Sequence, residues 1–501
     1  MILNDIISRI IKTRLPKIEH FMNNPLEVQQ EVFNELILDA KDTIWGKYYD
    51  YATINNWETF NQRVPLNDYN SLLPFFERIR KGENNVLWAS EIKWFSKSSG
   101  TTSTKSKFIP ISEESLQKCH FKGGKDMLAL YVNNYENSNI FSGTSLALGG
   151  SQQENEYNND IFIGDVSAIL IDNLPYWAEF FRTPKKEIAL MSEWETKLKK
   201  MIKDVSQKNV VSLAGVPSWM LLLLKGVIEN SGKTIEEVWP NLEVYFHGGV
   251  SLIPYRNQFN EILPQKMNYM ETYNASEGFF GLQDRIDNDS LLLLLDYGIY
   301  YEFIPMSEFS KENPKIINLS QVEKNKNYAM VISTNGGLWR YLIGDTISFT
   351  EIKPYRFKIT GRTKSYINLC GEELISDNAN RAIEIASKAT DAIVSEYTAG
   401  PFLGDKQYHE WIIEFDRKPN DLEKFSEILD MTLKELNSDY EAKRYKNLIL
   451  QKPKLNIVEK GTFYKWLKDK GKIGGQHKVP RLANNREYID QILKIAEYDN
   501  K

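Results

Sequence analysis

The chain has 501 residues, of which 42% are hydrophobic and 26% are charged, and its formal net charge is −5. Because acidic and basic residues are interspersed, the sequence shows no electrostatic footprint for nucleic acid or an anionic membrane, and no polyanionic partner is expected. The two cysteines, Cys119 and Cys370, provide neither a disulfide framework nor a zinc pattern, so we expect a cytoplasmic protein.

The first residues predict an amphipathic helix and not a targeting segment. Residues 1–21 space Ile and Leu at helical intervals between charged residues and lack the unbroken apolar core of a signal peptide. The longest apolar runs, "WMLLLL" (219–224) and "LLLLL" (291–295), are much shorter than the roughly 20 residues needed to span a bilayer. We expect both runs to be buried helix or strand.

The next elements alternate between helix and strand. Helical patterns dominate residues 20–90, and a strand-like "EIKWFSKSS" then leads into the hydroxyl-rich stretch "SSGTTSTKSK" (98–107). Ser112 then opens a long helix in an approximate capping arrangement with Glu114 and Ser115. Further short β-branched or aromatic segments alternate with helical ones down the chain, which indicates an α/β architecture.

A domain boundary is predicted in "RFKITGRTKSYINLCGEELI" (356–375), where Gly361 and Gly371 flank a strand-like segment. Beyond it come a helical stretch, two strand-like stretches and another long helix, which together suit a small α/β domain of about 140 residues. We therefore predict a large N-terminal ATP- and acyl-binding domain over 1–361 and a small C-terminal domain over 362–501.

The hydroxyl-rich stretch suits phosphate oxygens. Ser, Thr and Gly supply N–H and O–H donors in a tight turn, and glycine lets the main chain approach a ligand closely. Lys105 and Lys107 add positive charge. The stretch is not a GxxxxGK[ST] phosphate loop, because Gly100 has no partner glycine before a Lys-Ser/Thr pair. By composition alone, a solvated Ser/Thr loop is the favoured interpretation.

The order of six motifs resembles the adenylate-forming superfamily, which includes acyl-CoA synthetases and peptide-synthetase adenylation domains. They are "SSGTTSTK", "FHGGVS" (246–251), "TYNASEG" (272–278), "YLIGD" (341–345), "ITGRTKS" (359–365) and "GGQHKVPR" (474–481). In their particular forms, "HGGVSLIPYR" and "YNASEGFFG" among them, they are similar to the Gretchen Hagen (auxin-responsive) family of acyl acid amido synthetases, especially its bacterial branch. The resemblance covers essentially the whole chain.

The resemblance implies a fold and a reaction. The fold would be that of the adenylate-forming enzymes, with β-sheets packed by helices in the large domain and a small mobile α/β domain. The reaction would use ATP and Mg²⁺ to convert a carboxylic acid to acyl-AMP and pyrophosphate, and would then transfer the acyl group to an amine, expected to be an amino acid. Two alternatives stay open: transfer to coenzyme A, and a nucleotide-binding module without catalysis.

The resemblance also assigns the catalytic and phosphate-binding residues. Lys478 would swing over the α-phosphate and the acyl carboxylate, Glu277 would hold Mg²⁺, and Lys364 would be the hinge. A carboxylate in a short polar turn suits Mg²⁺, which prefers oxygen ligands, although a capping glutamate and a surface-loop lysine are the plainer readings of Glu277 and Lys478. The predicted phosphate-binding residues are Ser98, Ser99, Gly100, Thr101, Thr102, Lys107 and Ser276.

The adenine, ribose and acyl sites follow from the other motifs. Tyr273 would lie against adenine, Asp345 would accept hydrogen bonds from the ribose hydroxyls, and Arg362 would reach the ribose or phosphates. Their plainer readings are a core tyrosine, a turn aspartate and a hinge-side salt bridge. Gly248 and Gly249 would leave room for adenine, unless they form only a tight turn. Trp219 and Met220 are candidates for the acyl pocket wall, but they are equally suited to the core.

Overall fold

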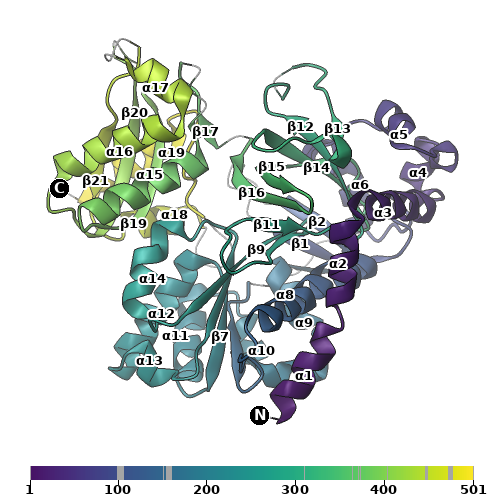
Figure 1. Cartoon of the computed structure of the whole chain (residues 1–501), viewed down its shortest axis with the longest axis horizontal. Coiled ribbons are helices and arrows are strands. Elements are labelled where there is room, and N and C mark those ends of the chain that lie inside the picture. The colour runs from purple at the N-terminus through teal and green to yellow at the C-terminus, as the bar shows by residue number, and fades with distance from the viewer. Residues whose placement is uncertain are drawn as a thin grey trace.

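The computed structural model describes most of the chain. Placement is not described for residues 1, 99–106, 151, 154–160, 310, 364, 371, 373, 403, 405, 446–448, 472–477 and 500–501. In the described residues helices and strands are mixed, and a large N-terminal part lies beside a smaller C-terminal part (Figure 1), which confirms the α/β class. Within these same residues, none of the helices has the length and apolarity required to cross a membrane.

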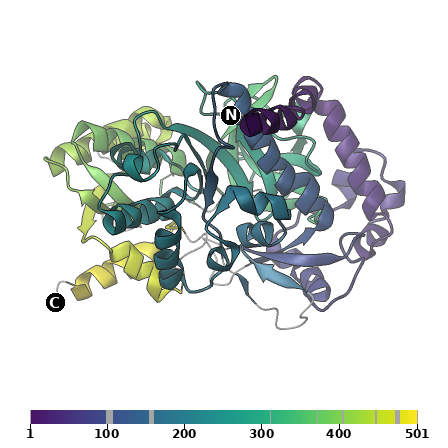
Figure 2. The same ribbon diagram turned by 90° about the horizontal axis from the view of Figure 1, so that it is seen from below.

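The N-terminal residues form a run of helices along one side of the molecule (Figure 2): α1 (Ile2–Lys12), α2 (Leu15–Asn23), α3 (Pro25–Ala40), α4 (Ile44–Tyr48), α5 (Trp57–Arg63) and α6 (Tyr69–Arg80). A reciprocal capping box fixes the start of α6, because Asp68 accepts from the Ser71 N–H at 2.9 Å and the Ser71 hydroxyl accepts from the Asp68 N–H at 3.0 Å. Asn67, just before this cap, pairs with Tyr341. The helical run is therefore tied to the strand that carries the "YLIGD" motif.

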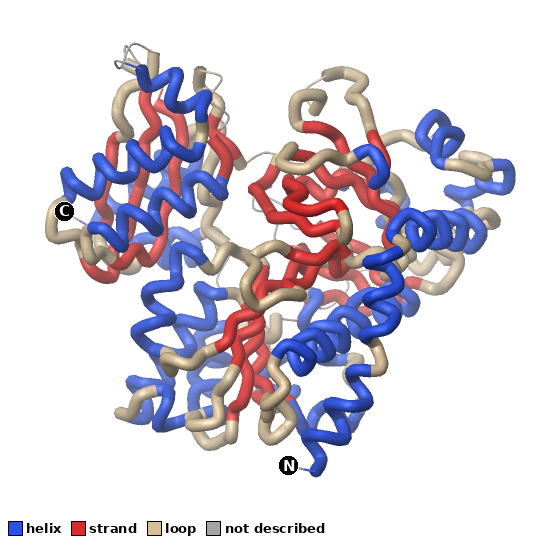
Figure 3. The backbone as a smooth tube through the Cα atoms, viewed as in Figure 1, coloured by secondary structure: helices blue, strands red, loops and turns tan. Residues whose placement is uncertain are grey.

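The main sheet has 12 strands and runs through the centre of the N-terminal part (Figure 3). One half is parallel and contains, in spatial order, β9 (Asn268–Ala275), β8 (Val244–Gly248), β7 (Val210–Gly215), β3 (Thr144–Ala147) and β6 (Arg182–Thr183). The other half continues antiparallel from β9 through β10 (Gly278–Gln283), β11 (Leu291–Leu293), β16 (Tyr355–Arg362), β15 (Tyr341–Ile352), β14 (Asn327–Thr334), β12 (Ile299–Pro305) and β13 (Ile317–Asn318).

Helices accompany the parallel half of this sheet: α10 (Lys186–Ala189), α11 (Trp194–Val205), α12 (Pro217–Ser231), α13 (Ile235–Val238) and α14 (Arg256–Ile262). The helix α9 (Val166–Asp172) instead packs against a second, smaller sheet. The run at 219–224 lies in α12, and the run at 291–295 begins with β11, so both lie in buried elements as predicted.

The strands on either side of the hydroxyl-rich stretch belong to the second sheet. Its four strands follow the order β2 (Lys107–Ser112), β1 (Ile92–Ser98), β5 (Phe162–Gly164) and β4 (Gln152–Gln153). Ser112 caps the following helix, as predicted, by accepting a hydrogen bond from the Ser115 N–H at 2.9 Å. This helix comprises α7 (Glu113–Ser115), a π-helical turn labelled η2 (Leu116–His120) and α8 (Phe121–Asn134).

The C-terminal part is built on the sheet β19 (Ile393–Phe402), β20 (Tyr408–Arg417) and β21 (Lys454–Val458). Its helices are α15 (Ser376–Ala389), α16 (Leu422–Leu436), α17 (Ser438–Arg444), α18 (Thr462–Asp469) and α19 (Glu487–Asp499). The short pair β17 (Tyr366–Ile367) and β18 (Leu374–Ile375) precedes α15. A hydrophobic cluster that includes Trp411 and Leu429 fills the space between this sheet and α15 and α16.

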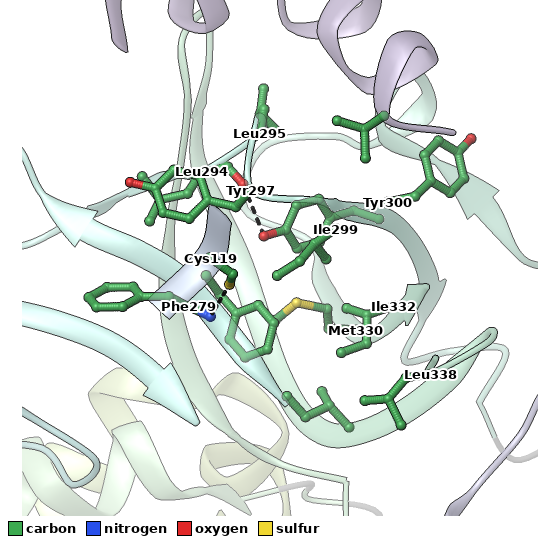
Figure 4. Packing of buried hydrophobic residues seen from close by; sticks show 14 of the residues in the cluster. Cys119, Phe279, Leu294, Leu295, Tyr297, Ile299, Tyr300, Met330, Ile332 and Leu338 are labelled. Atoms are coloured by element: carbon green, nitrogen blue, oxygen red, sulfur yellow. Dashed lines mark hydrogen bonds between the residues drawn. The ribbon is translucent and has the colours of Figure 1, made fainter. Parts of the chain in front are cut away.

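The largest hydrophobic cluster lies against the antiparallel half of the main sheet, and Figure 4 shows part of it. The Phe279 N–H donates to the buried Cys119 sulfur at 3.2 Å, and the Tyr301 hydroxyl donates to the Leu294 carbonyl at 3.1 Å. Because Cys119 belongs to the π-helical turn and Phe279 to β10, this contact holds the helix after β2 against the β9–β10 hairpin. The hairpin turn is the site of Glu277.

Candidate active site

Parallel strands of the main sheet end together at one edge. Gly215 of β7 lies opposite His247 of β8. Gly248, which ends β8, lies opposite Thr272 of β9. Glu277 follows β9 by two residues. In open α/β sheets ligands bind outside the carboxyl ends of the strands, so this edge is the expected place for a substrate.

Three of the predicted nucleotide-binding residues contact one another. Asp345 Oδ2 accepts a hydrogen bond from the Tyr273 hydroxyl at 2.6 Å, and Asp345 Oδ1 pairs with Arg362 Nε at 2.7 Å. The antiparallel register of β15 and β16 places Asp345 opposite Arg362. Burial, together with the negative charge of Asp345, raises the pKa of the Tyr273 hydroxyl, so this hydroxyl remains a donor.

These contacts test the simpler interpretations of Asp345 and Arg362. Asp345 lies within β15, so its interpretation as a turn aspartate is wrong. Arg362 does form the salt bridge that was its alternative role. Each Asp345 oxygen keeps a second lone pair, so the carboxylate can still accept from ribose hydroxyls. The ribose role of both residues stays a prediction.

Ser276 and Glu277 form the two-residue turn between β9 and β10. Ser276 accepts a hydrogen bond from the Ser96 hydroxyl at 2.8 Å, and Ser96 lies on β1. Glu277 is 9% exposed, and burial raises its pKa while the positive charge of Lys107 opposes this rise. The main sheet and the second sheet therefore meet at a buried carboxylate.

The hydroxyl-rich loop connects two paired strands. Ser98, the last residue of β1, lies opposite Lys107, the first residue of β2. Lys107 Nζ lies 5.7 Å from the centre of the Tyr69 ring. The four phosphate-binding candidates in the loop lie outside the described residues, as does the predicted hinge Lys364; the four are Ser99, Gly100, Thr101 and Thr102.

Lys478 reaches this site from the far C-terminal segment. Its ammonium donates to the Gly249 carbonyl. Burial and the positive charge of Arg362 lower its pKa to about 8, whereas the negative charges of Asp345 and Glu277 oppose the shift. The lysine therefore lies within electrostatic reach of the predicted ribose and Mg²⁺ residues, although it is far from them in the sequence.

Local packing explains why Gly248 and Gly249 are glycines. A Cβ on Gly248 would lie 2.3 Å from the Thr272 carbonyl oxygen, so only glycine fits between β8 and β9. Gly249 has a φ of +80°, and a Cβ there would lie 3.2 Å from Lys478 Nζ. The interpretation of these glycines as a close-packed turn is therefore supported, and the adenine role stays a prediction.

The acyl-pocket candidates both lie on α12. The Trp219 ring packs edge-on against Trp194, with ring centroids 4.8 Å apart, and Met220 is fully buried in a hydrophobic cluster. Both residues therefore serve the core, which was the alternative interpretation, and a lining role stays a prediction.

A buried lysine near this helix was not anticipated from the sequence. Lys197 of α11 donates to the Gly149 and Gly150 carbonyls at 2.6 and 2.9 Å, and burial lowers its pKa to about 8. Gly149 and Gly150 follow β3, so Lys197 holds the chain at the same edge of the sheet. In the sequence Lys197 is one of several lysines in a helix, and only its place on the apolar face could have indicated burial.

Three family models together match most of the chain. They are the GH3 family N-terminal domain over residues 14–267, the GH3 family central domain over 292–362 and the GH3 family C-terminal domain over 377–487. The chain belongs to the GH3 family. The resemblance inferred from the motifs is thereby confirmed. Membership of the bacterial branch stays a prediction.

Curated relatives of this GH3 chain include two proteins of Arabidopsis thaliana. Indole-3-acetic acid-amido synthetase GH3.2 is 24% identical over 443 residues, which cover 74% of this chain and 80% of the relative. Indole-3-acetic acid-amido synthetase GH3.3 is 22% identical over 551 residues, which cover 93% of this chain and 91% of the relative.

Solved structures share the fold of this GH3 chain. GH3.15 acyl acid amido synthetase matches with a TM-score of 0.78 at 16% identity, covering 97% of this chain and 96% of that one. The complex of the same protein with 2,4-DB gives a TM-score of 0.80 at 17% identity, with the same coverage. A 2-hydroxyisobutyryl-CoA ligase in its postadenylation state gives a TM-score of 0.58 at 12% identity, covering 98% of this chain and 92% of that one. The adenylate-forming fold predicted from the sequence is thus confirmed.

Proposed function

We propose that this GH3 chain is an acyl acid amido synthetase, which activates a carboxylic acid with ATP and then joins it to the amine of an amino acid. The observation that carries the proposal is the position of Lys478. This residue of the C-terminal part contacts Gly249 of the N-terminal part and lies within electrostatic reach of Glu277, Asp345 and Arg362. A protein that only binds a nucleotide has no need for such a lysine.

In the first half-reaction a carboxylate oxygen of the acid attacks the α-phosphorus of ATP. The bond from that phosphorus to the bridging oxygen breaks, and pyrophosphate leaves with the electron pair. Negative charge spreads over the phosphoryl oxygens as two anions approach, so a fixed cation lowers the barrier. Lys478 supplies that cation in this proposal. ATP bound beside it adds negative charge and favours its protonated form.

Glu277 is the residue that would hold Mg²⁺. The described residues contain no group of three or more His, Cys, Asp or Glu side chains that could form an all-protein metal site. Mg²⁺ usually takes one or two carboxylates and completes its shell with phosphate oxygens and water, so a single buried carboxylate fits this ion. When bound, Mg²⁺ would neutralise charge on the leaving pyrophosphate. Glu277 would act on the phosphates through this ion, and the Ser276 hydroxyl would donate to them.

In the second half-reaction the amine nitrogen attacks the acyl carbon of the acyl adenylate. The bond from this carbon to the AMP oxygen breaks, AMP leaves, and the nitrogen loses a proton to give the amide. The names of the relatives, indole-3-acetic acid-amido synthetases among them, support aryl and indole carboxylic acids as the first acids to test. Because adenylates hydrolyse readily, a site that excludes water favours the amide.

Pyrophosphate release tests this function directly. The purified chain is incubated with ATP, Mg²⁺ and pools of aryl, indole and aliphatic carboxylic acids, with a carboxylate-free control. Release that depends on a carboxylate is expected, and it should fall about 100-fold or more in Lys478→Ala. The matched control is Lys418→Ala, whose side chain is 67% exposed, and it should stay within about twofold of the unaltered chain.

The acid that gives pyrophosphate release is then used to identify the acceptor of the acyl group. Amino acids and coenzyme A are supplied in parallel, and the products are separated by mass. Family membership favours an amide with an amino acid. A thioester with coenzyme A would establish the first alternative, and absence of carboxylate-dependent release while ATP binds would favour the non-catalytic module.

A further inference from the structure

One buried and two half-buried polar side chains connect the two parts of the molecule. Tyr255 lies in η4 (Ile253–Tyr255), just before α14 in the N-terminal part, and its hydroxyl donates to Glu396 Oε1 of β19 at 2.7 Å. Arg481 Nη1 pairs with Glu396 Oε2 at 2.5 Å, and its Nη2 donates to the Tyr255 hydroxyl. We call Tyr255, Glu396 and Arg481 the bridging triad. Figure 1 shows α14 directly beneath β19.

Two aromatic rings also contact the Arg481 side chain. Its guanidinium lies 5.4 Å from the centre of the Tyr255 ring and 4.7 Å from that of the Tyr397 ring. Stacking on aromatic faces suits the planar guanidinium and would not suit a lysine. The triad and the Tyr397 ring therefore hold the Arg481 side chain in position.

The chain around Arg481 is fixed along β19. The Thr398 hydroxyl donates to the Pro480 carbonyl at 2.7 Å, the Ala399 N–H donates to the Arg481 carbonyl at 2.9 Å, and Ala399 pairs with Leu482. Lys478 is only two residues before Pro480. The position of this short segment therefore sets where the Lys478 side chain can reach.

The bridging triad is less exposed than the ion pairs between the two parts, and the buried Gln258 amide adds a further contact between them by donating to the Val394 carbonyl at 3.1 Å. Lys468 and Glu195, for example, lie 2.8 Å apart with 59% and 50% exposed side chains, and such surface pairs contribute about 0–1 kcal/mol. Arg481 and Glu396 are 12% and 18% exposed, and Tyr255 is 2% exposed. The triad is thus well suited to decide how the two parts are oriented.

We propose that Arg481 is a positioning residue for Lys478: through Tyr255 and Glu396 it holds the C-terminal part in the arrangement that brings Lys478 to the site. This inference rests on the proposed function, in which Lys478 serves the adenylation step. A polar contact suits such a role. Its members regain water when the two parts separate, so it specifies one orientation without holding the parts together permanently.

Separate assays of the two half-reactions distinguish a positioning role of Arg481 from general damage to the enzyme. Adenylation is followed as pyrophosphate release, and transfer is followed by supplying the chemically prepared acyl adenylate together with the amine. In Arg481→Gln, kcat for adenylation should fall about 10- to 100-fold with KM for ATP within about threefold, because displacement by an ångström is costly to catalysis. Transfer from the supplied adenylate should stay within about threefold. Equal losses in both half-reactions would overturn the proposal.

Two further variants exclude simple unfolding as the cause. Tyr255→Phe keeps the ring but removes the hydroxyl through which both hydrogen bonds of the triad cross between the two parts, so it should fold normally and show a loss of the same kind. In the double variant Lys478→Ala with Arg481→Gln, adenylation should be no slower than in Lys478→Ala alone, because Arg481 acts through Lys478. If the two losses multiply, the proposal is wrong.

A measurement without substrate tests the triad independently of the reaction. Nitroxide labels are attached to cysteines placed at the exposed positions Lys233 and Lys418, in a Cys370→Ser background. The distribution of distances between the labels should broaden in Arg481→Gln relative to the otherwise unaltered chain. An unchanged distribution overturns the proposal. If the unaltered chain shows no pyrophosphate release, the proposed function fails, and the label distances still decide the role of the triad.

Discussion

Raising the pH is expected to stop adenylation by removing the proton of Lys478. Burial and the positive charge of Arg362 lower the pKa of this ammonium to about 8, although Asp345 and Glu277 oppose the shift. One pH unit above its pKa, only about one lysine in ten keeps its proton. Because kcat/KM reports the groups of the free enzyme, kcat/KM for ATP should be level near pH 7, halve near pH 8 and be about tenfold lower near pH 9.

The assay is pyrophosphate release at low ATP from about pH 6 to about pH 10, at constant ionic strength. Lys478→Arg is the matched variant, because a guanidinium keeps its charge throughout this range. It should be slower than the unaltered chain, yet show no fall between about pH 7 and about pH 9. If the unaltered chain keeps its rate at pH 9, or if Lys478→Arg falls with the same midpoint, the reasoning about Lys478 is refuted.

Three substitutions test the packing in and around the site. Glu302 and Arg340 form a fully buried ion pair with two contacts of 2.9 Å, so Glu302→Ala should lower the free energy of unfolding by about 3–5 kcal/mol in urea denaturation. An unchanged midpoint would contradict this. Gly248→Ala would place a Cβ 2.3 Å from the Thr272 carbonyl oxygen and should lower Tm. Gly124→Ala would place its Cβ in open space beside the helix and should raise Tm, because alanine favours helix over glycine by about 0.5–1 kcal/mol. The opposite order of Tm values would refute the packing argument.

Local patterns in the sequence predicted local structure well. The strand before the hydroxyl-rich stretch, the cap at Ser112 and the polar turn at Glu277 all depend on residues within a few positions of one another. Periodicity and capping are short-range signals, so they can be read without the fold. The motif order also led to the correct family, because each motif keeps its own spacing.

Contacts between distant residues could not be predicted in this way. Arg481 meets Tyr255, which is 226 positions away, and Glu396, which is 85 positions away. Nothing within the motif "GGQHKVPR" indicates which carboxylate its arginine will find. The register that places Asp345 opposite Arg362 is set by pairing along whole strands, and a shift by one residue would turn each side chain to the other face.

The central claim is that a carboxylate oxygen of the acid attacks the α-phosphorus of ATP, and isotope transfer tests it most directly. The acid is labelled with ¹⁸O in its carboxylate and incubated with ATP, Mg²⁺ and the amine until amide has formed. The attacking oxygen stays on phosphorus when the amine displaces AMP, so the account predicts AMP that carries one ¹⁸O. Unlabelled AMP, or ¹⁸O in inorganic phosphate, would contradict the account.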